Sequence, residues 1–145
     1  MRILVVGDSF VPADVFRRGL NALADEHELA FLQLDESRTP PGLSIREYTG
    51  DPREIVEQIP GAEVLVVHGA PVTDEVLDAS DALRLVCCAR GGPVNVDVAA
   101  ASERGLPVVT TPAKNADAVA DQTLAFIVML ARRFPHAQRF LLEGN

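Results

Sequence analysis

The stretch CARGGPVNVD, residues 88–97, places two glycines and a charged side chain directly after an apolar run. Gly91 and Gly92 permit close approach to the backbone, and Arg90 adds a permanent positive charge. Backbone N–H groups beside a guanidinium suit a small anion such as a carboxylate. A simple turn between a strand and a helix explains the same residues, because glycine turns are common. This stretch alone leaves both interpretations open.

Two other segments place polar residues where an apolar run ends. In HGAP, the imidazole of His68 is able to hold a substrate carboxylate, and a surface histidine in a turn beside Gly69 is an equally good interpretation. Asn115 precedes a long helical pattern, as an N-cap or as an amide presented to a ligand. Because ligands of open α/β sheets bind at the carboxyl ends of the strands, we expect His68, Arg90 and Asn115 at one edge.

The segment GDSF, residues 7–10, invites comparison with serine hydrolases that carry Gly-Asp-Ser after a strand. Those enzymes need an Asp three residues before a His, so that the histidine is an oriented base. The residues three before His27, His68 and His136 are Ala24, Leu65 and Arg133. We therefore expect no base paired with a carboxylate, and interpret Asp8 or Ser9 as the cap of the next helix.

Short apolar runs alternate with amphipathic stretches, which predicts a mainly parallel β-sheet with helices on both faces. Apolar runs predict strands at 2–7, 28–34, 62–68, 83–89 and 106–111, and a short one at 45–49. Helical spacing and capping residues predict helices at 14–27, 51–59, 73–80, 95–105 and 115–134, with another starting in 135–145. Residues 35–44 are predicted to be a loop.

Composition limits the function. The chain has 145 residues, 48% of them hydrophobic and 23% charged, as in a soluble globular domain. A net charge of −8 argues against a nucleic-acid partner. Without a membrane-span or signal-peptide pattern, we expect a cytoplasmic protein with no membrane partner. Cys87 and Cys88 fit no metal site or disulfide framework and are predicted to be buried. No G-x-G-x-x-G motif or P-loop occurs.

The predicted helix 115–134 contains LAFIVML, which is too apolar for a half-exposed helix. We expect another domain or another chain to cover it. The sequence then ends at LLEGN without a closing strand, and this favours a truncated protein.

The segment from CARGGPVNVD to TLAFIVMLARR resembles the D-isomer-specific 2-hydroxyacid dehydrogenases, which include phosphoglycerate dehydrogenases. Members carry a pattern like R-x-G-x-G-x-D-N-V-D, then A-x-x-x-G-I-x-V, then N-x-x-x-V-A-E before a long apolar helix. The match covers residues 62–145 and is specific over 84–134. Residues 1–61 match only in the order of their elements.

The resemblance implies a flavodoxin-like substrate domain at 1–111, then a crossing helix and the start of a truncated Rossmann domain at 112–145. It implies hydride transfer between NAD or NADP and C2 of a small 2-hydroxy or 2-oxo acid. The family's catalytic Arg, Glu and His would lie beyond Asn145, so this chain would hold no catalytic residue, bind no cofactor tightly and be inactive alone. A homodimer through helix 115–134 is also implied.

The resemblance also implies roles for single residues. Asn115 falls on an Asn that contacts the substrate, and Gly91 and Gly92 fall on a loop whose backbone faces the substrate carboxylate. Asn95 and Asp97 match residues that start the next helix, a structural role. The substrate-binding candidates are His68, Gly69, Arg90, Gly91, Gly92 and Asn115, with no metal site.

Three positions depart from the family pattern. Arg90 replaces its first glycine, and Asp121 replaces the Glu of Val-Ala-Glu. His68 stands where Val-Arg-Ser often provides an Arg, which meets the substrate phosphate in phosphoglycerate dehydrogenases. The missing Arg argues against 3-phosphoglycerate as the substrate, unless Arg90 compensates.

Two other classes stay open. A stand-alone flavodoxin-like module that binds a small acid or a partner would keep the glycine loop and Asn115 and need no cofactor. A phosphoreceiver-like signalling domain is less consistent with the residues. It needs an acidic cluster after the first strand and an Asp at a later strand end, whereas Asp8 stands alone and the later strands end in His68 and Arg90.

Overall fold

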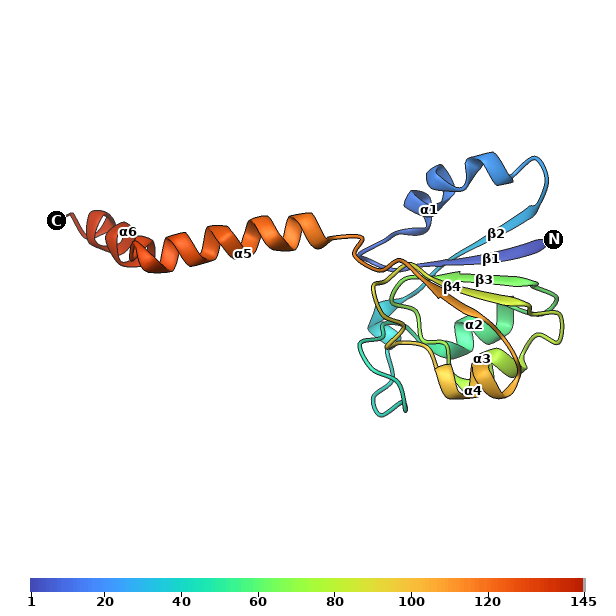
Figure 1. Ribbon diagram of the computed structural model, residues 1–145. Helices are drawn as coiled ribbons and strands as arrows, with labels where there is room; N and C mark the ends of the chain where they lie inside the picture. The colour runs from blue at the N-terminus through green and yellow to red at the C-terminus, as the bar shows by residue number, and fades with distance from the viewer. Residues whose placement is uncertain (145) are drawn as a thin grey trace. The chain divides into compact units, whose positions relative to one another are not determined.

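Five β-strands form one sheet in a computed structural model that describes residues 1–144 (Figure 1). The strands are β1 (Arg2–Gly7), β2 (Glu28–Gln33), β3 (Val64–Val67), β4 (Leu85–Cys88) and β5 (Val108–Thr110). Their spatial order is β2-β1-β3-β4-β5, and all four pairings are parallel. This is the strand order of flavodoxin-like folds. The predicted fold class is therefore confirmed.

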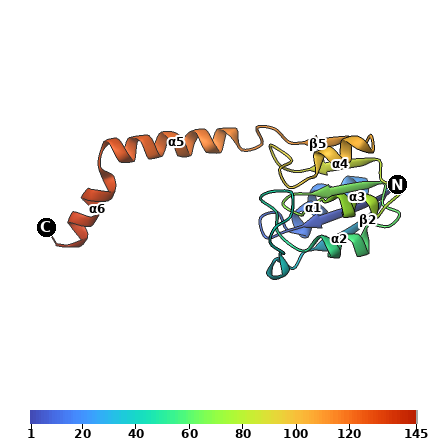
Figure 2. The same cartoon turned by 90° about the horizontal axis from the view of Figure 1, so that it is seen from below.

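Helices cover both faces of the sheet (Figures 1 and 2). One face packs against α2 (Pro52–Gln58), α3 (Asp74–Asp78) and α4 (Val98–Glu103), and the other against α1 (Ala13–Gly19). Successive residues of a strand point to opposite faces, so Val5 and Val6 of β1 enter different core clusters, and neither is exposed. Burial on both faces explains why these strands are continuous apolar runs.

Side-chain caps begin the three helices on the first of these faces. Asp51 accepts a hydrogen bond from the backbone of Arg53 (2.9 Å) and precedes a proline at the first position of α2. Thr73 caps α3. Asp97 accepts from Ala100 N–H (3.0 Å) at the start of α4. These caps satisfy donors that the first turn of a helix leaves unpaired. The predicted starts at Asp51 and Thr73 are confirmed.

Some predicted boundaries are wrong. α1 ends at Gly19, a poor helix former, and the short 3₁₀ helix η1 (Asn21–Leu23) follows. Pro12 occupies the N-cap position of α1, because Asp8 and Ser9 bond elsewhere. A second 3₁₀ helix, η2 (Glu36–Arg38), lies within the predicted loop. Residues 45–49 form no strand, and the helix predicted to begin at 95 begins at 98.

The contacts divide the chain into two compact units, Met1–Pro112 and Ala113–Asn145. The second unit contains α5 (Ala116–Ala131) and α6 (Phe134–Leu142), with Arg133 in the left-handed conformation between them (φ 52°). Asn115 occupies the N-cap position of α5, but its side chain makes no capping hydrogen bond.

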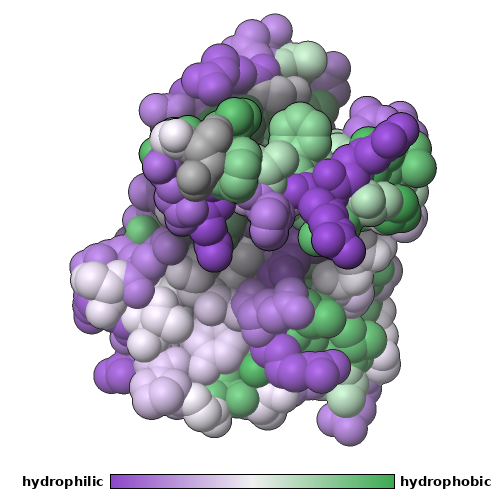
Figure 3. All heavy atoms as spheres, turned by 90° about the vertical axis from the view of Figure 1, so that its left-hand side faces the viewer, coloured by the Kyte–Doolittle hydropathy of each residue, from purple (hydrophilic) through white to green (hydrophobic). Residues whose placement is uncertain are grey.

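Apolar side chains of α5 and α6 are exposed, and Figure 3 shows hydrophobic side chains at the surface. They include Val119, Leu124, Phe126, Ile127, Val128, Leu130, Phe140 and Leu141. That another domain or chain covers α5 stays a prediction. Among the described residues, no helix has both the length and the apolar character needed to cross a membrane.

Candidate functional site

Polar residues follow three neighbouring strands at the carboxyl edge of the sheet. Asp8 comes directly after β1, His68 directly after β3, and Arg90 two residues beyond the end of β4. The chain leaves β1 toward β2 on one side, while β3 lies on the other, so β1 and β3 flank the point where the strand order reverses. Ligands of open α/β sheets bind outside the strand ends at such a point.

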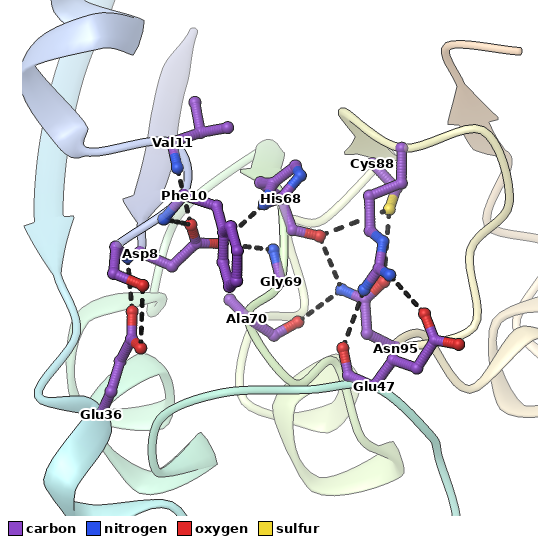
Figure 4. Close-up of polar contacts among 12 residues, drawn as sticks. Asp8, Phe10, Val11, Glu36, Glu47, His68, Gly69, Ala70, Cys88 and Asn95 are labelled. Carbon is purple, nitrogen blue, oxygen red and sulfur yellow. Dashed lines mark hydrogen bonds and ion pairs between the residues drawn. The ribbon is translucent and has the colours of Figure 1, made fainter. Parts of the chain in front are cut away.

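Asp8 and His68 form a hydrogen-bonded pair across this point (Figure 4). His68 Nδ1 lies 2.9 Å from Asp8 Oδ2, and the same oxygen accepts from Gly69 N–H at 2.6 Å. Asp8 Oδ1 accepts from Phe10 N–H and Val11 N–H, both at 2.8 Å. Asp8 is completely buried. Four donors therefore satisfy a carboxylate that has no access to water.

These donors keep Asp8 ionised. Burial acts to raise the pKa of Asp8, but hydrogen bonds from Val11, His68 and Gly69 together outweigh it, so the pKa lies below its ordinary value. Next to a carboxylate, His68 Nδ1 carries a proton and donates it, an assignment inferred from the geometry. Nε2 of His68 has no partner within residues 1–144 and stays able to bind a ligand.

A hollow of about 370 Å³ adjoins this pair. The loop before α2 contributes to it, and two hydrogen bonds hold that loop in place. Tyr48 hydroxyl donates to Pro40 carbonyl at 2.7 Å, and Thr49 N–H donates to Gly69 carbonyl at 2.9 Å. The lining residues are Phe10, Glu47, Tyr48, Thr49, His68, Gly69 and Arg90.

Arg90 is bound to Glu47 at the same hollow. Its guanidinium donates to Glu47 carbonyl oxygen at 2.8 Å and to Glu47 Oε2 at 2.5 Å. Glu47 has a φ of 52°, a left-handed conformation that residues with a side chain seldom adopt. Strands have negative φ angles, so the backbone at Glu47 cannot belong to the strand that was predicted at 45–49.

The glycines of the site differ in their surroundings. A Cβ at Gly69 would lie 2.9 Å from Asp8 Oδ2 and 3.3 Å from Thr49 Cγ2, so any other residue would force the buried Asp8 to shift. At Gly91 and Gly92 a Cβ would meet nothing within 4 Å. Within residues 1–144, the N–H groups of Gly91 and Gly92 have no acceptor. Neither glycine lines the hollow.

Asn95 supports the loop that carries His68. Its buried side-chain amide donates to His68 carbonyl at 3.1 Å and to Ala70 carbonyl at 2.7 Å (Figure 4). Asn95 therefore fixes the backbone that presents the imidazole and is not part of the helix that Asp97 caps. Cys88 is buried beside Asn95 Oδ1 (3.5 Å), and Cys87 is half-buried, with burial raising the pKa of its thiol.

Three of the six predicted substrate-binding residues meet at one hollow. They are His68, Gly69 and Arg90, with Gly91 and Gly92 next in the chain. Asn115 belongs to the second unit, where it lines a separate hollow on α5 with residues that include Gln122. No group of His, Cys, Asp and Glu in the described part of the chain is suited to a metal ion.

The expectation that no histidine has a carboxylate partner was wrong. It considered only the residue three positions before each histidine, whereas Asp8 reaches His68 from another strand. Ser9 does not complete a triad, since its hydroxyl donates to Glu36 Oε2 at 3.0 Å. Glu47 and Phe10 were not predicted from the sequence to line the site. Only for the Asp8–His68 pair did the sequence contain a signal, because both residues directly follow apolar runs.

Comparisons with known proteins show the family and the fold of the chain. The family model described as D-isomer specific 2-hydroxyacid dehydrogenase, catalytic domain, matches residues 21–134. A D-3-phosphoglycerate dehydrogenase of Archaeoglobus fulgidus is 34% identical over 106 residues, which cover 72% of this chain and 20% of that protein. A glyoxylate reductase of Korarchaeum cryptofilum is 30% identical over 137 residues, 94% of this chain and 38% of that protein.

Among solved structures, the NAD-dependent formate dehydrogenase of Staphylococcus aureus in complex with NAD has a TM-score of 0.71 and 21% identity. The alignment covers 100% of this chain and 41% of that one, and it shows the fold alone. The chain thus spans less than half the length of these relatives.

Proposed function

The chain belongs to the D-isomer-specific 2-hydroxyacid dehydrogenase family, and we propose that it is the substrate-binding part of an NAD- or NADP-dependent oxidoreductase. The whole enzyme would act on the CH–OH group of a D-2-hydroxy acid or reduce the matching 2-oxo acid. The observation that carries this proposal is the hollow at the strand ends, where the buried Asp8 orients His68 beside Arg90.

In this proposal His68, Gly69, Arg90, Gly91, Gly92 and Asn115 bind the substrate. His68 Nε2, when the imidazole is protonated, and the N–H groups of Gly91 and Gly92 supply hydrogen-bond donors that the described residues leave unused. Gly69 contributes by its missing side chain, because its N–H is bound to Asp8. The hydride-transfer machinery, including the family's catalytic Arg, Glu and His, would lie outside this chain.

The residues at the strand ends do not fit a dinucleotide. A dinucleotide loop needs closely spaced glycines that let the pyrophosphate meet a helix N-terminus. After β1, a Cβ at Gly7 would lie 2.2 Å from Ala13 N, so the space beside this glycine is filled by the chain itself, and no G-x-G-x-x-G sequence follows any of the strands. The proposal therefore assigns the nicotinamide cofactor to residues outside this chain.

The proposal includes a domain division and an assembly. Residues 1–111 would form the substrate domain, and 112–145 the crossing helix and the start of the nucleotide-binding domain. The division of contacts after Pro112 supports this. The exposed apolar side chains of α5 support a homodimer through this helix. The expected cytoplasmic location, and the absence of nucleic-acid and membrane partners, stay predictions.

A stand-alone module that binds a small acid is the second candidate. One observation favours it: every residue that lines the hollow lies within Met1–Pro112, so the hollow needs no other domain.

An assay of the native gene product tests both candidates. We expect a polypeptide larger than the 15.6 kDa of this chain that oxidises NADH or NADPH with a 2-oxo acid. Replacing His68 by Gln should raise KM about tenfold, the value of one hydrogen bond to a charged group. His27→Gln, at a half-buried histidine that does not line the hollow, is the matched control. A native product near 15.6 kDa that binds 2-oxo acids without oxidising either cofactor would support the module instead.

A further inference from the structure

We propose that the hollow selects 2-oxo or 2-hydroxy acids whose distal substituent is uncharged and aromatic or apolar, and that Glu47 is the residue that sets this preference. The inference rests on the proposed function. It concerns the part of the substrate away from the carboxylate and C2.

The first argument is charge compensation. Among the described residues that line the hollow, the cationic groups are Arg90 and, when it is protonated, His68. Each already has a carboxylate, Glu47 at 2.5 Å and Asp8 at 2.9 Å. With His68 neutral, the two carboxylates outweigh the single guanidinium. With His68 protonated the two cations and the two carboxylates balance, so in either state a second carboxylate or a phosphate on the substrate would meet no excess of positive charge and would find the Arg90 guanidinium already bound to Glu47.

The second argument is the way in which Glu47 is held. Arg90 donates to both the carbonyl and the carboxylate of Glu47, so the guanidinium is engaged twice by one residue. The left-handed backbone of Glu47 is kept by neighbouring bonds, Arg46 N–H to Val94 carbonyl and Thr49 N–H to Gly69 carbonyl, both 2.9 Å. Unfavourable backbone angles persist where surrounding contacts fix them, and they cluster at ligand sites. Arg90 therefore does not replace the missing phosphate-binding Arg of the family.

The third argument is the aromatic lining. Phe10 is 81% exposed, and its ring centroid lies 6.3 Å from that of His68 (Figure 4). Tyr48 hydroxyl donates to Pro40 carbonyl and accepts from Leu43 N–H, so the hydroxyl is already occupied by its own loop. Two aromatic side chains therefore offer apolar surface to the distal group of a substrate.

Binding of three probes to the chain tests the inference without a cofactor. Backbone amide NMR shifts of Thr49 and Gly69 report occupancy of the hollow. The probes are phenylpyruvate, 2-oxoglutarate and 3-phosphohydroxypyruvate, which share the 2-oxo acid and differ in the distal group. We expect phenylpyruvate to bind about tenfold more tightly than the two doubly charged acids.

Two variants then remove the carboxylate at position 47. Glu47→Gln should tighten binding of 2-oxoglutarate and 3-phosphohydroxypyruvate about tenfold and change that of phenylpyruvate less than about twofold. Glu47→Gly should act alike, and it folds readily because glycine favours the φ of 52° found there. Glu57→Gln, exposed on α2, is the matched control and should change nothing.

Equal binding of all three probes by the unmodified chain overturns the inference alone, and so does an unchanged preference in both Glu47 variants. If none of the probes shifts Thr49 or Gly69 in any of these proteins, the proposed function fails and the inference with it.

Discussion

The loops after β3 and β4 lie at the same edge of the sheet, and both contain glycine, but the first is tightly packed and the second is not. The loop His68-Gly69-Ala70 is fixed from two sides, by Asp8 and by Asn95. The loop Arg90-Gly91-Gly92 has open space where a side chain would stand, and its two glycine N–H groups have no acceptor among residues 1–144.

The difference teaches that glycine after a strand serves two physical purposes in this molecule. Gly69 is needed by the folded chain itself, because Asp8 occupies the volume of a Cβ. At Gly91 and Gly92 no neighbouring atom of the described chain excludes a Cβ, so their packing does not require glycine. Changes in the first loop should therefore lower stability, and changes in the second should affect binding.

The largest effect is expected from Asp8→Ala. It leaves three backbone N–H groups and His68 without their acceptor in a buried place, so the free energy of unfolding should fall by about 3 kcal/mol. Urea denaturation measures it. Asp25→Ala, exposed and outside this cluster, should stay within about 0.5 kcal/mol. Equal losses in both variants would remove the distinction drawn for the first loop.

Gly69→Ala should come next. The added Cβ must displace Asp8 Oδ2, and overpacking of this kind costs about 2 kcal/mol of unfolding free energy. Gly91→Ala is the matched control, because nothing lies within 4 Å of its Cβ, and it should be nearly neutral. A Gly91→Ala loss as large as that of Gly69→Ala would contradict the comparison.

Acid should weaken the first loop. Because the pKa of Asp8 is lowered in the folded state, its ionised form stabilises the fold above the ordinary Asp pKa, about 3.9. That stabilisation is lost as the pH falls from there through the lowered pKa. Asp8→Asn lacks this contribution, so its unfolding free energy should depend less on pH between about 4 and 2. Parallel pH profiles for the two proteins would show that Asp8 has no lowered pKa.

The smallest effect on stability is expected from Gly92→Val, within about 0.5 kcal/mol, because the position is open. If this loop binds the substrate carboxylate as proposed, the added side chain would obstruct that contact, and the Kd for a 2-oxo acid should rise about tenfold. Thermal unfolding and the NMR titration check the two halves of this prediction. Unfolding without any change in Kd would mean that the second loop is structural as well.

Local patterns in the sequence were enough for the parallel sheet. The apolar runs contain all five strands, because a buried parallel strand needs apolar residues on both faces. The caps at Asp51 and Thr73 could also be predicted from the sequence, since a cap and the helix it begins are neighbours in the chain.

Contacts between segments that are distant in the sequence could not be predicted from local patterns. Asp8 and His68 are 60 residues apart, and Glu47 and Arg90 are 43 apart. Each pair meets only because the strand order and the loop before α2 bring their backbones together. The periodicity of a segment determines whether it forms a strand or a helix, but its neighbours depend on packing of the whole sheet. The sequence alone determined the five strands of the sheet and the glycine loop, and the tertiary structure decided which charges face one another in the site.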